Sequence, residues 1–330
     1  MRKSKEFLNI LLGAMARETE AFNYYNEASQ SSPYDETKAL LVQLSLEEKR
    51  HREILAGEYG RIKRLIFSKG KEYIKREKIS FAIPNELPYL RVRTIPGIKA
   101  AAIDLPSRFL GGDYVDTFPI TFGKKSLLGV VIYDVMGHGI DATGLKAVTR
   151  KTLDRIREAL REEEILNLAN PAWLVSQVNS ELWRECRQRG SFVSLLYMVI
   201  DRIGRKLTYT SAGHQPAVLV RRKNGDSETL SDSELLVGVE GEREYTQSSL
   251  DFSRGDLVLL FTDGVVETLN TKQEEYGTKR LVELLKKNSQ LDLAELLLEI
   301  CQDLKKFNRG KNFKDEVSMI ALKIEKEKNK

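Results

Sequence analysis

Four aspartates stand where long apolar runs of this chain meet loop segments, and this arrangement limits the folds available to it. Asp113 lies in GGDYVD, Asp134 ends LLGVVIYD, Asp263 ends DLVLLFTD and Asp315 opens DEVSMIALKI. A carboxylate buried mid-strand without a partner costs several kcal/mol, whereas acids at strand ends can converge on a divalent cation that neutralises them. The pattern predicts a β-rich domain with an oxygen-ligated metal centre.

Turn chemistry is the alternative explanation for these aspartates. Asp-Gly and Gly-Asp pairs favour tight turns, because glycine tolerates unusual backbone angles and aspartate hydrogen-bonds its own backbone. Either explanation accounts for any one of the four residues. All four together, each beside an apolar run, favour the metal site.

The spacing of apolar residues predicts strands that alternate with helices. We expect helices near 141–161, 172–188, 278–288 and 291–307. Strands clustered with helices in this way predict an α+β domain of two packed sheets flanked by helices, an αββα sandwich. The expected strands are 98–103, 127–134, 192–200, 206–211, 217–221, 257–262 and 317–324.

Three segments follow from the pattern: an all-α hairpin over residues 1–66, a basic linker over 67–90 and the sandwich domain over 91–326. Apolar residues recur at helical spacing on both sides of Ser32. Ser32 supplies an N-cap and Pro33 a first helical residue, so the second helix is expected to start there.

The composition is that of a cytoplasmic protein. The chain has 330 residues, of which 41% are hydrophobic and 31% charged, and its two cysteines form no CxxC motif. The first sixteen residues imitate a secretion signal, but Glu6 and Asn9 interrupt the apolar run. No apolar stretch is long enough for a transmembrane helix.

The formal net charge of +5 is concentrated in one segment. Between Arg61 and Lys78, eight Lys or Arg face two Glu, a net of +6, so the rest of the chain sums to about −1. Such a run can contact anionic lipid or nucleic acid. A solvated helical connector explains it better, because no nucleic-acid motif accompanies it.

The motifs resemble the SpoIIE/RsbU-type branch of the PPM metal-dependent protein phosphatases. From about Pro96 to Lys323 the matching segments occur in the family's order, which implies a phosphatase acting on phosphoserine or phosphothreonine. These segments are PGIKAAAIDLPSRFLGGDYVD, IYDVMGHGIDA, GSFVSLLYMVID, LTYTSAGHQPAVL, LLVGV, GDLVLLFTDGVVE, EEYG and KDEVSMIAL.

The resemblance implies that Asp113, Asp134, Asp263 and Asp315 are the catalytic metal ligands. Asp134 is expected to bridge two Mn²⁺ or Mg²⁺ ions, with the backbone carbonyl of Val135 as a further ligand. Two such ions activate a water and orient the phosphoryl oxygens for in-line attack. No covalent phospho-enzyme is required.

Four other polar residues lie in the same motifs. Asp116 is expected to orient the ligands, with direct metal ligation as the alternative. His138 and His214 are expected to support loops by hydrogen bonding. The histidine of eukaryotic-type relatives has no counterpart, because Met136 holds its place. Glu316 stands where the family commonly has a second aspartate, so its role stays open.

The N-terminal hairpin places ionisable residues on its apolar seam. Glu48 and His51 form a Glu-x-x-His pair, and Glu18 lies 14 residues before Ser32 while Glu48 lies 16 after it. At about 1.5 Å rise per residue, an antiparallel hairpin brings the two glutamates within about 3 Å in height. This resembles half of a ferritin-like or rubrerythrin-like di-iron site, which implies a homodimer with a four-helix bundle. Dimerisation without iron is the alternative.

The expected protein is a regulatory serine phosphatase whose N-terminal domain senses a signal. The resemblance implies a phosphorylated STAS-domain anti-anti-sigma protein as substrate and an activator protein as a further partner. The alternatives are a ferritin-like oxidoreductase, with the phosphatase domain as its output, and a scaffold.

Overall fold

The chain divides into two units, Met1–Ser80 and Phe81–Lys330. Within the first, residues 21–31 and 35–46 are helical, which agrees with a second helix that starts shortly after Ser32. Among the described residues, no helix has the length and apolar content needed to cross a bilayer. The computed structural model describes residues 19, 21–31, 34–46, 49, 89–90, 92–105, 112–123, 125–136 and 140–325.

The second unit contains two antiparallel sheets. One sheet has six strands in the order β1-β2-β11-β10-β7-β8, and the other has five in the order β3-β4-β5-β6-β9. Every pairing between the described strands is antiparallel. The strands are β1 Tyr89–Leu90, β2 Ile98–Leu105, β3 Tyr114–Phe122, β4 Lys125–Val135, β5 Val193–Asp201, β6 Lys206–Ala212, β7 Ala217–Val220, β8 Ser227–Leu230, β9 Ser248–Asp251, β10 Leu257–Phe261 and β11 Val317–Ile324.

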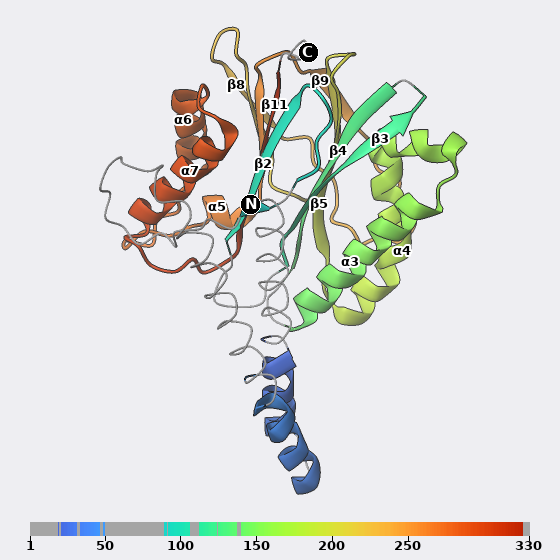
Figure 1. The fold of residues 1–330 in the computed structure, drawn as a ribbon, viewed down its shortest axis with the longest axis vertical. Helices are drawn as coiled ribbons and strands as arrows, with labels where there is room; N and C mark the ends of the chain where they lie inside the picture. The colour runs from blue at the N-terminus through green and yellow to red at the C-terminus, as the bar shows by residue number, and fades with distance from the viewer. Residues whose placement is uncertain are drawn as a thin grey trace, which may run out of the picture. The chain divides into compact units, whose positions relative to one another are not determined.

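Helices cover the outer face of each sheet (Figure 1). The helices α3 and α4 pack on the five-stranded sheet, and α7 packs on the six-stranded sheet, with α6 beside it. The prediction of an αββα sandwich is confirmed. The helices are α3 Ile140–Ala159, η1 Glu162–Ala169, α4 Pro171–Arg189, α5 Asp263–Val266, α6 Thr278–Asn288 and α7 Leu293–Phe307.

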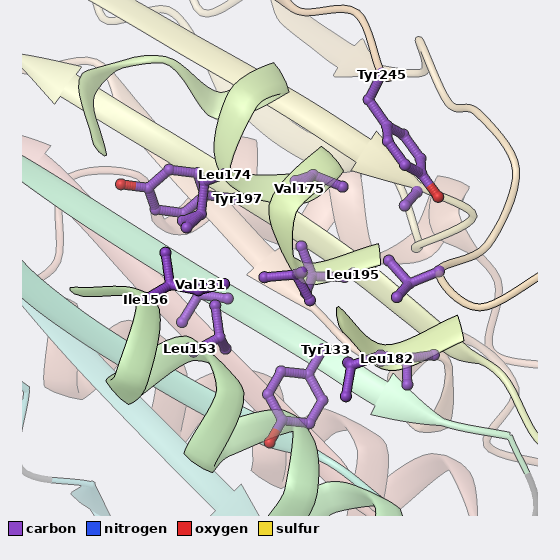
Figure 2. Packing of buried hydrophobic residues seen from close by; sticks show 14 of the residues in the cluster. Val131, Tyr133, Leu153, Ile156, Leu174, Val175, Leu182, Leu195, Tyr197 and Tyr245 are labelled. Atoms are coloured by element: carbon purple, nitrogen blue, oxygen red, sulfur yellow. The ribbon is translucent and has the colours of Figure 1, made fainter. Parts of the chain in front are cut away.

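Three apolar clusters hold these layers together. One lies between the sheets, and the others lie between each sheet and its helices. The strand β4 explains this: Leu128, Val130 and Ile132 face the partner sheet, while Val131 and Tyr133 face the helices. Figure 2 shows the helix-facing cluster, in which strand residues Val131, Tyr133, Leu195 and Tyr197 pack against Leu153, Ile156, Leu174, Val175 and Leu182.

Candidate active site

Two hydrogen-bonded strand pairs bring the four aspartates to one region. Asp113 directly precedes β3, and Asp134 is the penultimate residue of β4; Tyr114 pairs with Tyr133, so the two acids are neighbours across the ladder. Asp263 begins α5 after β10, and Asp315 stands two residues before β11. The five-stranded sheet therefore supplies one pair of acids and the six-stranded sheet the other.

Asp113 is held in place by residues at the ends of β10 and β11, which belong to the six-stranded sheet. Its side chain is 3% exposed, and the Thr262 hydroxyl donates to its Oδ2 over 2.6 Å. Its backbone N–H donates to Glu316 Oε2 over 2.9 Å. Thr262 itself is held by Ser318, whose N–H donates to Thr262 Oγ1 over 3.1 Å. These bonds connect the two sheets directly at the acid cluster.

Burial and mutual repulsion raise the pKa values of the carboxyl groups in this cluster, so they are weaker acids than usual. Burial raises the pKa of Asp134 to about 9, and the negative charges of Asp113, Asp263 and Asp315 add to the rise. Burial also raises the pKa of Asp113 to about 7, opposed by the Thr262 hydroxyl and assisted by Glu316. Carboxyl groups in this condition need a compensating positive charge.

The pair on the six-stranded sheet is more open. Burial, followed by the charge of Asp315, raises the pKa of Asp263. Asp263 is half-buried and Asp315 is exposed to solvent. The cluster is thus buried on one side and reachable on the other.

The local backbone and the donor atoms suit a divalent cation. A Cβ on Gly112 would lie 2.7 Å from both Asp134 Oδ1 and the Val135 carbonyl oxygen, so only glycine leaves that space free. Carboxylate and carbonyl oxygens are the ligands of Mg²⁺ and Mn²⁺. As the side chains stand, no three His, Cys, Asp or Glu among the described residues are gathered closely enough to hold an ion. The chemistry of the donor set nevertheless fits hard cations.

Two further acids and a lysine belong to the same region. Glu316 Oε2 lies 4.0 Å from Lys146 Nζ, and it accepts the hydrogen bond from Asp113 described above. Asp104 on β2 accepts from Ser318 Oγ over 3.1 Å, and burial raises its pKa while Lys146 opposes the rise. The rule that an acid ends an apolar run also selects Asp104, in AAAIDL. Glu316 fixes the backbone of Asp113, and the sequence had left the role of Glu316 open.

The expected role of Asp116 as an orienting residue of the ligands is not supported by its contacts. Its Oδ2 accepts from Arg157 Nη1 of α3 over 3.1 Å, and its Oδ1 accepts from the Thr117 N–H over 2.8 Å. The Arg157 guanidinium also lies over the Phe118 ring. Alternation along β3 explains the difference, because Asp116 takes the helix-facing side with Phe118.

His214 is buried beside the cluster, and its expected role in supporting a loop by hydrogen bonding stays a prediction. Its Nδ1 lies 2.9 Å from Ser194 Oγ. Burial lowers its pKa to about 4, against hydrogen bonding to the backbone of Phe261 and Ser194. His138 and the hairpin residues Glu18, Glu48 and His51 lie outside the described residues.

Sequence comparison places most of the sandwich in one family. Residues 124–325 match the family described as Stage II sporulation protein E (SpoIIE). Phosphoserine phosphatase RsbU of Bacillus subtilis is 23% identical over 257 residues, which cover 77% of this chain and 71% of that protein. Phosphoserine phosphatase RsbP of the same organism is 24% identical over 218 residues, 65% of this chain and 49% of that protein.

Solved structures share the fold at low identity. The SiaA-PP2C domain of Pseudomonas aeruginosa superposes with a TM-score of 0.57 at 17% identity, over 68% of this chain and 85% of that chain. The RsbU and RsbW domains of Rv1364c from Mycobacterium tuberculosis superpose with a TM-score of 0.55 at 22% identity, over 72% of this chain and 64% of that chain. RsbX in complex with magnesium superposes with a TM-score of 0.50 at 16% identity, over 72% of this chain and 100% of that chain.

Proposed function

The chain belongs to the SpoIIE family of protein serine/threonine phosphatases, and we propose that its four clustered aspartates hold the two metal ions of that reaction. The observation that carries the proposal is the burial of Asp113 beside Asp134: burial raises the pKa of both carboxyl groups, and the charge of Asp113 adds to the rise at Asp134. Asp263, Asp315 and the Val135 carbonyl complete the donor set. Bound Mn²⁺ or Mg²⁺ would supply charge neutralisation and activation of the attacking water.

The protein's own residues have separate tasks in this proposal. Thr262 occupies Oδ2 of Asp113, which leaves Oδ1 for an ion. Glu316 fixes the backbone N–H of Asp113, so the carboxylate is positioned from both ends. Asp113 and Asp134 would release their retained protons when an ion arrives, because coordination requires the carboxylate form.

Hydrolysis of a phosphoserine peptide after complete metal removal tests the proposal. We expect no turnover in chelator, recovery on addition of Mn²⁺ or Mg²⁺, and proton release on metal addition at pH 7 in weakly buffered solution. Turnover that persists without divalent metal would contradict the assignment. Recovery without proton release would contradict the role of the buried pair.

The client protein and the cellular context are a further part of the proposal. We expect a phosphorylated STAS-domain protein as substrate, in the cytoplasm, as the family resemblance implies. Support comes from RsbU and RsbP, both described as phosphoserine phosphatases. Incubation with a phosphorylated STAS-domain protein and with an unrelated phosphoprotein tests this, since equal rates on both would remove the client assignment.

Exposed apolar side chains support a homodimer formed through the first unit. Five large apolar residues among those described in this unit are at least 41% exposed in the single chain. Exposed apolar surface is commonly a site of contact with a partner. These are Tyr24, Tyr34, Leu40, Val42 and Leu46. Sedimentation of the full chain should give a dimer, and Leu40→Glu with Leu46→Glu should give a monomer that keeps the sandwich folded.

Iron binding by Glu18, Glu48 and His51 stays a prediction. Elemental analysis of the full-length protein loaded with ferrous iron should give iron that is lost in Glu18→Ala, Glu48→Ala and His51→Ala. The Mn²⁺ content of the sandwich should not change in these variants. Wild-type protein without iron would leave dimerisation as the role of the hairpin.

Coupling between hairpin and phosphatase is the regulatory part of the proposal. The linker 67–90 joins the two, and a bias of about 1.4 kcal/mol changes a rare active population about tenfold. Phosphatase rates of the full-length protein in apo, ferrous and oxidised forms, at constant Mn²⁺, should differ. A chain that begins at Phe81 should show one rate, and identical rates for the full-length protein would instead favour an activator protein.

A further inference from the structure

A small cavity opens directly beside two of the aspartates. Its volume is about 170 Å³, and Asp134 and Asp263 form part of its wall. The other described lining residues are Met136, Ser194, Gly213, His214, Gln215 and Leu236. A group bound in this cavity would lie next to the phosphoryl group that the aspartates and their ions hold.

Met136 presents an apolar side chain at this cavity from a fixed backbone. Its N–H donates to the Phe192 carbonyl over 2.9 Å, and its carbonyl accepts from Ser191 Oγ over 2.8 Å. The side chain is nevertheless 51% exposed. A methionine thioether adapts its shape to apolar partners, so it forms a deformable but anchored wall.

Leu236 supplies a second apolar wall that the fold also fixes. A Cβ on Gly213 would lie 2.6 Å from Leu236 Cγ, and Gly213 has φ +67°, so this turn accepts only glycine at that distance. The next residue, Val237, exchanges two backbone hydrogen bonds with Val193 of β5, over 3.1 and 3.0 Å. Two anchored apolar side chains therefore share a cavity with the acid cluster.

A second cavity beside the cluster has a different character. It has a volume of about 280 Å³, includes Asp315, and is lined by Glu267, Glu275, Lys311 and Lys314 among others. Leu269 and Phe313 also line it, so this cavity combines charged and apolar walls. It lies beside Asp315, whereas the smaller cavity lies beside Asp134 and Asp263.

We infer that the smaller cavity is a specificity subsite that binds an aliphatic side chain of the phosphoprotein, one to three residues from its phosphoserine. The inference rests on the proposed function, because it places the phosphoserine at the acid cluster. An extended chain advances about 3.3–3.6 Å per residue, so near neighbours of the phosphoserine reach a cavity that shares walls with the ligands. When the aliphatic side chain binds, it covers the side chains of Met136 and Leu236 and removes apolar surface from water. This burial favours an aliphatic over a polar side chain at that position of the substrate.

A set of phosphoserine peptides tests the inference. Each carries leucine or aspartate at one of the three positions before or after the phosphoserine, and kcat/KM is measured at saturating Mn²⁺. We expect leucine to exceed aspartate by roughly tenfold at one position, the scale of discrimination by one apolar contact. Equal values at all six positions, or no turnover of any peptide, would overturn the inference.

Variants identify the cavity as the origin of the preference. Met136→Gln keeps the length of an exposed side chain, and Leu236→Ala removes the second wall; each should lower the leucine-to-aspartate ratio to below about threefold. Val239→Ala is the matched control, since Val239 is 41% exposed but does not line the cavity, and it should keep the ratio. An unchanged ratio in Met136→Gln and Leu236→Ala would overturn the assignment. Hydrolysis of p-nitrophenyl phosphate by the wild type tests the proposed function separately.

Discussion

The two sheets contribute acids of different character to one cluster. The five-stranded sheet supplies Asp113, which is buried, and Asp134, which is half-buried, and burial raises their pKa values to about 7 and about 9. The six-stranded sheet supplies Asp263, which is half-buried, and Asp315, which is exposed. We call Asp113 and Asp134 the enclosed pair, because Asp113 is buried, and Asp263 and Asp315 the open pair, because Asp315 is exposed. Positive charge should stabilise the ionised form of the enclosed pair most, and the open pair leaves a route for ions and substrate. We expect the two pairs to respond differently to mutation and to pH.

Loss of a ligand should have the largest effect on activity. Asp134→Asn and Asp263→Asn are each expected to lower kcat with Mn²⁺ at least about a hundredfold, equivalent to about 2.7 kcal/mol, because the site loses an anionic ligand. Circular dichroism should show an intact fold in both. Activity within tenfold of wild type in either variant would remove that residue from the ligand set.

The stability of the metal-free protein should fall as pH rises, and the enclosed pair should be the cause. The folded-state pKa values of Asp113 and Asp134 lie above the ordinary value of 3.8, so the folded state retains protons that the unfolded state has lost. The resulting penalty is absent below about pH 4 and grows up to about pH 9. Thermal unfolding between pH 5 and 9 should show a falling melting temperature, at about 3 °C per kcal/mol.

Two comparisons separate this cause from a general effect of pH. Asp134→Asn should flatten the pH dependence, and Mn²⁺ at pH 8 should raise the melting temperature of the wild type more than that of the variant. Asp315→Asn should reduce the slope less than Asp134→Asn does, because it removes only one of the charges that add to the raised pKa of Asp134. If the melting temperature falls with pH equally in the wild type and both variants, the two pairs of acids do not differ in this respect.

The hydroxyl that links the sheets should have an intermediate effect. Thr262→Val removes the hydrogen bond to Asp113 and leaves the buried Ser318 N–H without that acceptor, at a cost of about 2 kcal/mol in the free energy of unfolding. Urea denaturation measures this cost. Thr208→Val is the matched control, because its 2.8 Å bond to Ser249 is exposed to solvent. Equal losses in the two variants would show that the link at Thr262 is unimportant.

Asp116→Asn should have the smallest effect on catalysis. Asp116 pairs with Arg157 on the helix-facing side, so we expect kcat within about twofold of wild type and a loss of up to about 1 kcal/mol in stability. A large drop in kcat at unchanged Mn²⁺ affinity would contradict this expectation. It would show that the five-stranded sheet contributes a third acid to catalysis.

Long apolar runs made most of the sandwich predictable. The strand expected at 317–324 and the helix expected at 278–288 have those bounds in the structure. The strand β3 is absent from the expected set, because Asp116 and Pro119 interrupt the apolar pattern of YVDTFPITF. β8 and β9 are also absent, since both are four residues long and mostly exposed, which leaves no apolar periodicity to detect.

The candidate site was predictable in its acids but not in their supports. Each aspartate ends or begins an apolar run, which is a local signal. Thr262 and Glu316 reach Asp113 across 149 and 203 residues of sequence, so only the folded chain shows their role. Asp116 lies in the same motif as Asp113, but the alternation of side chains along β3 places it on the helix-facing side with Arg157.

The division of the acids between two sheets also divides them along the chain. Asp113 and Asp134 precede the turn between β5 and β6, and Asp263 and Asp315 follow it; Ile203 in that turn is 68% exposed. Neither fragment produced by a cut at this turn carries all four acids. Hydrolysis by a mixture of the fragments would therefore report that the two halves had reassembled, which makes the enzyme its own indicator of folding.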